Sequence, residues 1–200
     1  KELEKKGTLG YNFPYFTDYF ADYNPQYWPK AKVITAIAMF YDLEDPGAFL
    51  KNISKHLHQQ GICVIQQNYL LSMLNQNAYD NIIHEHLTYF SLTSFENLLK
   101  KYDLEVVDVV ENDINGGSFR CYVAHKDVFA QTTRLLEMRT FENEIDWLLA
   151  LKTFAKTVKK VNTDLKDYLK DKKNVYLYGA SNRGNTIVQS TDILQYIDGV

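Results

Sequence analysis

Residues 32–67 read KVITAIAMFYDLEDPGAFLKNISKHLHQQGICVIQQ, and this stretch decides the fold class. It begins and ends with the apolar runs Val33–Met39 and Ile62–Gln67, which are typical of strands buried on both faces of a sheet. Between them, Asp45 and Pro46 mark a helix start, because Asp is a preferred N-cap and Pro suits the first helical position. The glycine before the second run is expected to end that helix. The stretch therefore predicts one β-α-β unit.

The pattern continues with a loop, a helix and a pair of strands. Thr93, followed three residues later by Glu96, has capping-box spacing and predicts a helix over residues 95–103. The apolar runs at 104–110 and 118–125 are separated by a Gly-Gly turn, which predicts an antiparallel pair. These alternating elements indicate the α/β class, with a parallel-dominated sheet that ends in an antiparallel pair.

The remaining third of the chain predicts a connector and the opening of a second unit. From Phe141 to about Leu169, apolar residues recur at helical spacing and predict one long amphipathic helix. The stretch NVYLYGASNRGNT, residues 174–186, is typical of a strand, a glycine-rich turn and a helix start. We expect three parts, at residues 1–128, 129–172 and 173–200.

The composition narrows the possible classes of protein. The chain has 200 residues, of which 46% are hydrophobic and 24% charged, as in ordinary globular proteins. A net charge of -3 gives no electrostatic basis for binding nucleic acid. No apolar run reaches the roughly 18 residues of a membrane span. Two cysteines that are far apart, Cys63 and Cys121, favour a reducing cytoplasm. We therefore expect a cytoplasmic protein without nucleic-acid or membrane partners.

Residues 81–91, NIIHEHLTYFS, place two of the five histidines on either side of Glu85. The zinc-protease motif is absent, because Thr88 stands where its second histidine would be required. A metal shared by His84 and His86 is not expected, since structural zinc sites usually add cysteines at short spacing. An acid/base site and a polar loop whose imidazoles bond backbone carbonyls both remain open.

Four stretches, in order, resemble the S-adenosylmethionine-dependent C-methyltransferases that modify nucleotide-linked deoxysugars. They are ITAIAMFYDLEDPGAFL, HEHLTYFS, NGGSFR and YGASNRGNT, and they span about residues 32–187. The resemblance implies a Rossmann-like class I methyltransferase sheet with an antiparallel end pair, followed by part of a second Rossmann-like domain. It implies S-adenosylmethionine as cofactor and a small-molecule acceptor, such as a nucleotide sugar.

The same alignment places Lys1 inside the methyltransferase domain, with the early glycine-rich loop missing. We therefore expect an N-terminally truncated fragment that binds the cofactor poorly and is inactive alone. Residues 1–128 would then be the C-terminal portion of the methyltransferase domain, 129–172 a helical connector, and 173–200 the start of a substrate-binding domain.

The resemblance also assigns roles to single residues. His86 matches the family's base, a role that suits histidine because it titrates near neutral pH. Glu85 is its functional neighbour, and Asp42 is the next candidate base. Ile83 and Asp42 replace a tyrosine and a histidine of many sugar C-methyltransferases, which changes the available donors. Cofactor contacts are expected from Asp18, Tyr19, Thr35, Ala36 and Phe40. Substrate contacts are expected from His84, Asn115, Gly117, Ser118, Arg120, Gly179, Ser181, Arg183 and Asn185.

Alternatives stay open beside these roles. His84 also suits a structural role, and the Asn-Gly-Gly stretch suits a simple hairpin turn. Two other functions compete for the whole chain. One is a nucleotide-dependent oxidoreductase using the Gly179 turn. The other is a non-catalytic ligand-binding or assembly module on the same scaffold.

Overall fold

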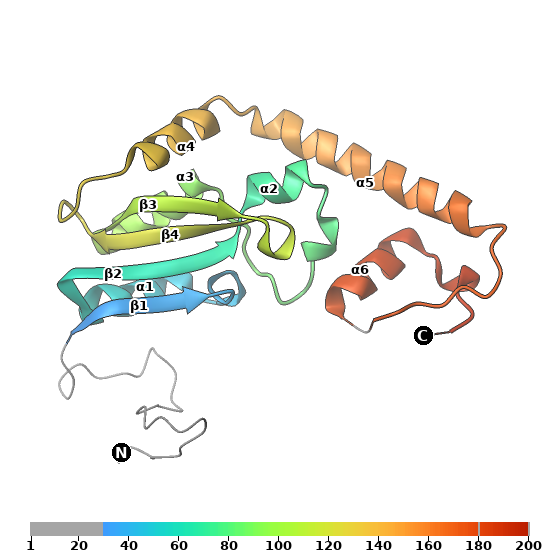
Figure 1. The fold of residues 1–200 in the computed structure, drawn as a ribbon, viewed down its shortest axis with the longest axis horizontal. Helices are drawn as coiled ribbons and strands as arrows, with labels where there is room; N and C mark the ends of the chain where they lie inside the picture. Colours follow the sequence, from blue (N-terminus) through green and yellow to red (C-terminus); the bar gives the residue numbers. More distant parts are fainter. Residues whose placement is uncertain (1–29, 180, 200) are drawn as a thin grey trace, which may run out of the picture.

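The computed structural model describes residues 30–179 and 181–199, so Asp18 and Tyr19 lie outside the described residues. A four-stranded sheet in the order β1-β2-β4-β3 forms the centre of the larger unit (Figure 1). The strands are β1 (Ala31–Ile37), β2 (Leu57–Asn68), β3 (Leu104–Asn112) and β4 (Ser118–His125). β1 pairs parallel with β2, and β4 pairs antiparallel with both β2 and β3.

This topology confirms the α/β class and the antiparallel end pair. The expectation of a parallel-dominated sheet is wrong for the described strands, since only the β1–β2 pairing is parallel. The difference arises from the order of the strands, which the sequence pattern does not show. β4 inserts between β2 and β3, so the second strand of the pair makes two antiparallel contacts rather than one.

The helix between β1 and β2 starts as its sequence predicts and ends earlier. Asp45 accepts a hydrogen bond from the backbone N–H of Ala48 at 2.8 Å and so caps α1 (Pro46–His56). β2 begins at the next residue, and Gly61 therefore lies inside the strand instead of ending the helix. A Cβ at Gly61 would lie 2.9 Å from the carbonyl oxygen of Ala31. Glycine is needed there because the two strands approach closely.

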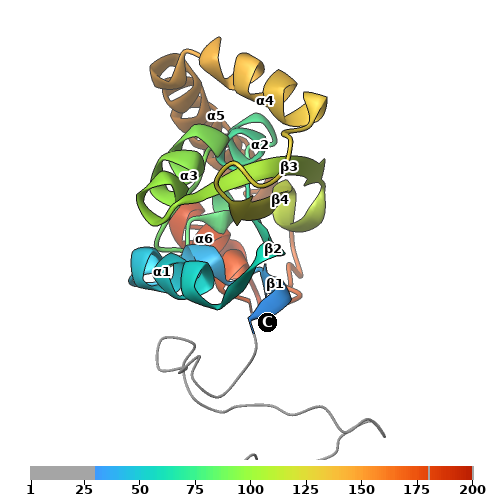
Figure 2. The ribbon, with the colours of Figure 1, turned by 90° about the vertical axis from the view of Figure 1, so that its left-hand side faces the viewer.

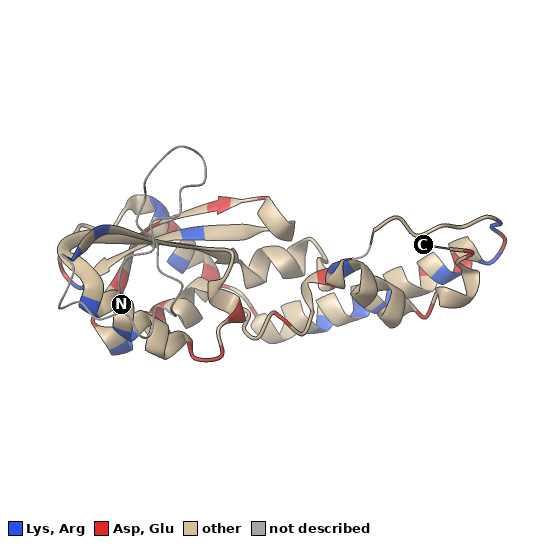
Figure 3. Cartoon of the chain, turned by 90° about the horizontal axis from the view of Figure 1, so that it is seen from below, with Lys and Arg blue, Asp and Glu red and all other residues tan. Residues whose placement is uncertain are grey.

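Helices cover one face of the sheet. The remaining α-helices are α2 (Leu70–Asn75), α3 (Leu92–Leu99), α4 (Thr133–Asn143), α5 (Trp147–Leu169) and α6 (Asn182–Thr191). Figure 2 shows α1 and α3 side by side against one face. Val33 and Ile37 point to the other face and are 63% and 48% exposed. Charges of both signs are interspersed over the described elements in Figure 3.

The cap of α3 lies two residues before the predicted one. Ser91 accepts a hydrogen bond from the backbone N–H of Ser94 at 3.1 Å, and Ser94 Oγ accepts one from the backbone N–H of Ser91 at 3.0 Å. This reciprocal pair is a capping box with serine in place of the usual Glu or Gln. Thr93 and Glu96 were therefore the wrong pair, and both bind residues of α4 instead.

Two carboxylates join α3 to α4. Glu142 is 1% exposed and accepts hydrogen bonds from the backbone N–H groups of Leu92 at 2.6 Å and Thr93 at 2.9 Å. These N–H groups belong to the first turn of α3, where they have no partner inside the helix. Glu96 forms an ion pair with Arg139 at 2.6 Å. Side chains of α3 and α4 thus satisfy each other's buried polar groups.

The predicted single helix from Phe141 to Leu169 is wrong, because it consists of two helices. α4 ends at Asn143, and α5 starts after Asp146, whose carboxylate accepts a hydrogen bond from the backbone N–H of Leu149 at 3.0 Å. Apolar spacing alone does not reveal a break of three residues, whereas the N-cap aspartate does. α5 then runs from the sheet to the second unit (Figure 1).

The second unit has its own small core of Leu169, Val188 and Ile193. Among the described residues of this unit, the predicted strand forms one isolated parallel bridge, between Tyr176 and Gly199, instead of a full strand. The predicted helix start is confirmed, as α6. The chain thus returns beside the extended segment after α6, which makes a minimal β-α-β arrangement.

Candidate active site

The His-Glu-His loop is fastened to the end of β1. After β1 the chain forms a short 3-10 turn at Phe40–Asp42. The carbonyl oxygen of Tyr41 accepts hydrogen bonds from the backbone N–H groups of Leu87 at 3.0 Å and Thr88 at 3.1 Å. The rings of Tyr41 and His86 meet edge to face, with centroids 4.5 Å apart. Backbone and ring contacts together place His86 at the carboxyl end of a parallel strand.

The structure brings together the three residues that we expected to be catalytic. Asp42 and Glu85 are exposed, and His86 is half-buried beside them. Partial burial raises the pKa of the Asp42 carboxyl; the nearby His86 lowers it, and the negative charge of Glu85 raises it. Both neighbours are therefore within electrostatic reach of Asp42. Within the described part of the chain, Glu85 forms no hydrogen bond to His86, so it does not fix the imidazole tautomer here.

Unpaired polar atoms gather near the same end of the sheet. The Nδ1 atom of His86 is buried without a hydrogen-bond partner among residues 30–179 and 181–199. The same holds for both amide atoms of Gln67, which is 1% exposed, and for Oδ1 of Asn68. Buried polar groups in proteins are nearly always paired. The carboxyl end of the parallel β1–β2 pair is also where α/β sheets place ligands, so this edge has the properties of a binding site.

The rings of the other three histidines, which lie in α1, β2 and β4, contact backbone groups. His56 and His125 each contact a backbone carbonyl oxygen, at 2.7 and 3.2 Å, and His58 accepts a hydrogen bond from a backbone N–H at 3.1 Å. No such backbone bond to the rings of His84 or His86 occurs in the described structure. Their loop is therefore not explained as a corner that satisfies backbone carbonyls. His84 itself is exposed.

Backbone conformation and packing explain the residues of the Asn-Gly-Gly stretch. Asn115 and Gly117 have positive φ angles of 56° and 102°, as a tight turn requires. A Cβ on Gly117 would lie 2.3 Å from the Cβ of Ser72. Ser118 is buried and its hydroxyl donates to the carbonyl oxygen of Ile114 at 2.7 Å. The turn accounts for these residues, and their role as substrate contacts stays a prediction.

The expected cofactor residues differ in their exposure to solvent. Thr35 is exposed on the uncovered face of β1, whereas Ala36 is 3% exposed and points to the core. The ring of Phe40 is fully buried and packs against three other phenylalanine rings. Packing, rather than side-chain contact with a ligand, is therefore what the structure shows for Ala36 and Phe40.

The glycine-rich turn before α6 is built around its helix cap. Gly179 has φ 126°, which side chains rarely allow. The hydroxyl of Ser181 accepts a hydrogen bond from the backbone N–H of Gly184 at 3.2 Å. The backbone N–H of Asn185 donates to the Ser181 carbonyl oxygen at 3.1 Å, and the Asn185 side chain is exposed. Ser181 thus serves the helix, while Asn185 is accessible.

The two arginines assigned to the substrate both have partners from the sheet unit. Arg120 donates from Nε and Nη2 to the side-chain oxygen of Gln66, at 2.9 and 2.6 Å. Arg183 pairs with Asp80 at 2.5 Å. Burial raises the pKa of Tyr41, and the positive charge of Arg183 acts in the opposite direction. Arg183 belongs to α6 and reaches, through Asp80, the segment that leads into the His-Glu-His loop.

Sequence reasoning missed three residues of this arrangement. None of Tyr41, Asp80 and Asn81 was assigned a role from the sequence. Asn81 is 1% exposed; its Nδ2 donates to the Asn115 carbonyl oxygen at 3.0 Å, and its Oδ1 accepts from Asn68 at 3.4 Å. It joins the end of β2 to the Asn-Gly-Gly turn. The available signal was position, since Asn81 opens the stretch 81–91 that contains His84 and His86, and Asp80 directly precedes it.

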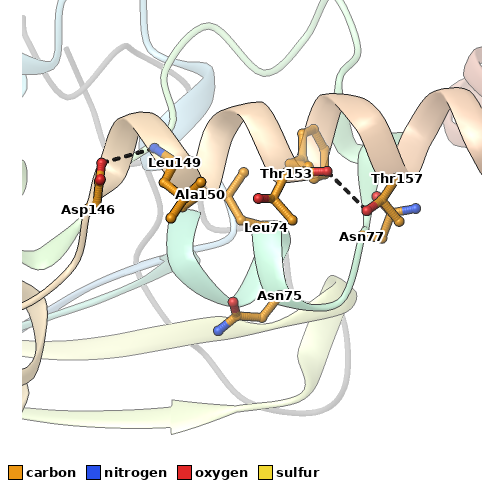
Figure 4. Close-up of a pocket in the computed structure, with 9 residues that line it drawn as sticks. Leu74, Asn75, Asn77, Asp146, Leu149, Ala150, Thr153 and Thr157 are labelled. Atoms are coloured by element: carbon orange, nitrogen blue, oxygen red, sulfur yellow. Dashed lines mark hydrogen bonds between the residues drawn. The ribbon is translucent and has the colours of Figure 1, made fainter.

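A hollow of about 380 Å³ lies elsewhere, between α2 and the first half of α5 (Figure 4). Its lining contains one carboxylate, Asp146, which caps α5, and no histidine. It therefore lacks free acid/base groups. In residues 30–179 and 181–199, no group of three or more His, Cys, Asp or Glu side chains could hold a metal ion. The helices in these ranges are too short or too polar to cross a membrane.

Comparison with known protein families shows which family the chain belongs to. A family model described as a methyltransferase domain matches residues 4–109, more than half of the chain. The chain belongs to the S-adenosylmethionine-dependent methyltransferases. A second model, described as a C-methyltransferase C-terminal domain, matches this methyltransferase at residues 113–200. The resemblance drawn from the four sequence stretches is therefore confirmed at the level of the family.

Individual relatives are more distant. The chain is 29% identical over 167 residues to the C-methyltransferase NovU of Streptomyces niveus. This match covers 79% of the chain and 39% of NovU, so the chain spans well under half the length of that relative. Among solved structures, LepI in complex with SAM gives a TM-score of 0.45 at 16% identity, covering 55% of this chain and 29% of LepI. An S-adenosylmethionine-dependent methyltransferase of Clostridium acetobutylicum gives 0.42 at 15% identity, covering 55% and 63%. These TM-scores are too low to bear on the site.

Proposed function

We propose that the complete protein transfers a methyl group from S-adenosylmethionine to a carbon atom of a small-molecule acceptor, with a nucleotide-linked sugar as the expected class. The observation that carries this proposal is the cluster of Asp42, Glu85 and His86 at the carboxyl end of β1. Family membership supports methyl transfer. The match of residues 113–200 to a C-methyltransferase domain supports carbon as the acceptor atom.

The cluster suits the proton transfer that carbon methylation needs. A carbon beside a carbonyl group becomes nucleophilic only after a proton leaves it, and a positioned base must take that proton. His86 is the base, since imidazole accepts protons near neutral pH. Tyr41 holds the imidazole through its edge-to-face contact. Asp42 and Glu85 add negative charge, which stabilises the imidazolium that forms.

S-adenosylmethionine supplies the methyl group in this family. The described residues fit only part of a site for it: Thr35 is accessible, Ala36 and Phe40 are in the core, and the other two expected contacts lie outside the described residues. The structure therefore supports proposals about two steps, namely the proton transfer and the binding of the acceptor. A cytoplasmic location also stays a prediction.

The second unit supports a charged acceptor. Arg183 comes from α6 and lies near Tyr41, so α6 and the His-Glu-His loop border the same region. Arginine binds phosphate groups through paired N–H donors, which suits the diphosphate of a nucleotide sugar. The acceptor would then lie between the sheet unit and the second unit.

The test is a methyl-transfer assay on the complete protein, with isotope-labelled S-adenosylmethionine and nucleotide-linked keto sugars. We expect labelled product whose new methyl group is attached to carbon, as read by NMR. Acceptor binding without transfer would instead indicate the non-catalytic module. Turnover that needs a nicotinamide cofactor would indicate the oxidoreductase.

A further inference from the structure

The side chain of Arg183 crosses from α6 to the sheet unit. Its Nε donates to a carboxylate oxygen of Asp80 at 2.7 Å, and its Nη2 lies 2.5 Å from the same oxygen. The two side chains are 35% and 22% exposed, so the pair is partly shielded from water. Partial shielding strengthens an ion pair relative to the fully exposed pairs that contribute little.

This pairing leaves part of the guanidinium group available. Asp80 occupies the edge formed by Nε and Nη2 through a single oxygen. The donors on Nη1 and the second hydrogen of Nη2 can still form the parallel bonds that arginine makes with phosphate. Arg183 can therefore bind an anion while Asp80 keeps its orientation.

A second contact fixes α6 beside the same segment. The hydroxyl of Thr186 donates to the carbonyl oxygen of Ile82 at 3.2 Å. Asp80 and Ile82 both lie between α2 and the His-Glu-His loop, so α6 is joined to the chain immediately before His84. The ion pair then sets where the guanidinium group lies relative to that loop.

We propose that Asp80 is a positioning residue for the acceptor: it holds Arg183 so that the guanidinium group meets the diphosphate of a nucleotide-linked acceptor beside the His-Glu-His loop. This inference rests on the proposed function and adds to it the residue that orients the arginine.

The direction of the effect separates positioning from charge. A carboxylate that acts only through its charge weakens the attraction of a neighbouring arginine for anions. On charge alone, Asp80→Asn would therefore strengthen the binding of a nucleoside diphosphate. A positioning role predicts weaker binding, because the released side chain must be ordered again when the ligand binds.

The experiment is calorimetry of UDP binding to the complete protein. We expect Asp80→Asn to raise Kd about tenfold, and Asp80→Glu to restore much of the affinity. In the Arg183→Gln background, Asp80→Asn should change Kd no further, since it acts through that arginine. Asp192→Asn is the matched control: it removes a carboxylate from the exposed Lys166–Asp192 pair of the same unit and should leave Kd unchanged.

Turnover gives a second readout that a merely structural role would not move. In Asp80→Asn the KM for the acceptor should rise while the KM for S-adenosylmethionine stays constant. Circular dichroism checks that each variant is folded, and Asp80→Ala, for which the same rise in Kd is expected, replaces Asp80→Asn if that variant is not. An unchanged or lower Kd in the folded variant overturns the inference, as does an effect that persists without Arg183.

Different results would contradict the proposed function and the role of Asp80. A wild-type protein that binds UDP and transfers no methyl group contradicts methyl transfer, while the Asp80 comparison still stands. A wild-type protein that does not bind UDP overturns the role of Asp80 directly.

Discussion

The ring of His86 meets the edge of an aromatic ring, and it lies within electrostatic reach of Asp42. In the complete protein, we expect His86→Ala to lower kcat about 100- to 10,000-fold, the usual contribution of a general base, with little change in cofactor affinity. Steady-state kinetics and calorimetry check this. His84→Ala is the control, because His84 is exposed on the same loop and should lose far less activity.

Activity that survives His86→Ala and disappears in His84→Ala would show that the wrong imidazole was assigned. The pH profile offers an independent check. The limb of the profile that reports the protonation of the general base should be absent in the His86 variant. If His86→Ala and Asp42→Asn both keep full activity, the mechanism needs no protein base.

Asp42 gives a prediction about stability and pH. Burial raises its pKa in the folded state above the ordinary value of 3.8. The folded protein therefore keeps this proton longer than the unfolded chain, and stability decreases as pH rises from 3.8 through the folded pKa. Asp42→Asn removes that loss, so the variant should unfold at a higher temperature than wild type at pH 7 and at an equal temperature near the acid end of the range.

Asp108 is the matched comparison, with the opposite sign. Burial raises its pKa, but hydrogen bonds from Thr132 and Arg134 outweigh burial and lower it. The stability from this carboxylate is present above the unfolded pKa and is lost as pH falls through the folded one. Asp108→Asn should therefore lower the unfolding temperature at pH 7. Shifts of the same direction in both variants would contradict this account.

At the scale of elements, the contact of α4 with α3 depends on Glu142. Its carboxylate accepts from the hydroxyl of Tyr69 at 2.9 Å as well as from two N–H groups that start α3. We expect Glu142→Ala to lower the free energy of unfolding by about 3 kcal/mol, since several buried donors lose a charged partner together. Urea denaturation measures it. The control is Glu144→Ala at the exposed C-cap residue of α4, for which we expect less than about 0.5 kcal/mol.

Helix starts that depend on a few neighbouring residues could be predicted from the sequence. Asp45 and Pro46 start α1 as expected, because a cap acts within one turn. The order of the strands and the place of Glu142 could not be predicted, since both depend on segments that meet only in the folded chain. In the site, the grouping of Asp42 with His86 was expected from family resemblance. The Tyr41 anchor and the partner of Arg183 come from contacts that the sequence does not display.

At the scale of the whole molecule, the two units differ in the size of their cores. The sheet unit buries a large cluster, whereas the second unit buries Leu169, Val188 and Ile193. Segments with few buried contacts open at lower free energy. In hydrogen exchange, we expect the amides of α6 to exchange at least about tenfold faster than those of β2 and β4. Equal protection of both units would show that they open as one.

That difference bears on the site, because Arg183 belongs to the unit with the smaller core. Binding of a nucleoside diphosphate should then slow exchange in α6 more than in the sheet. A ligand that binds only the folded form of the second unit stabilises that form against opening. Exchange measured with and without UDP checks this. A change confined to the sheet would place the ligand away from Arg183.

The anchor of the His-Glu-His loop has a consequence for how the site can change over time. The carbonyl oxygen of Tyr41 holds Leu87 and Thr88 through backbone N–H groups, which every residue except proline carries. Mutation of side chains therefore leaves the attachment in place. Substitutions at Ile83 or Asp42 should therefore change the side chains beside His86 and leave the attachment of the loop unchanged.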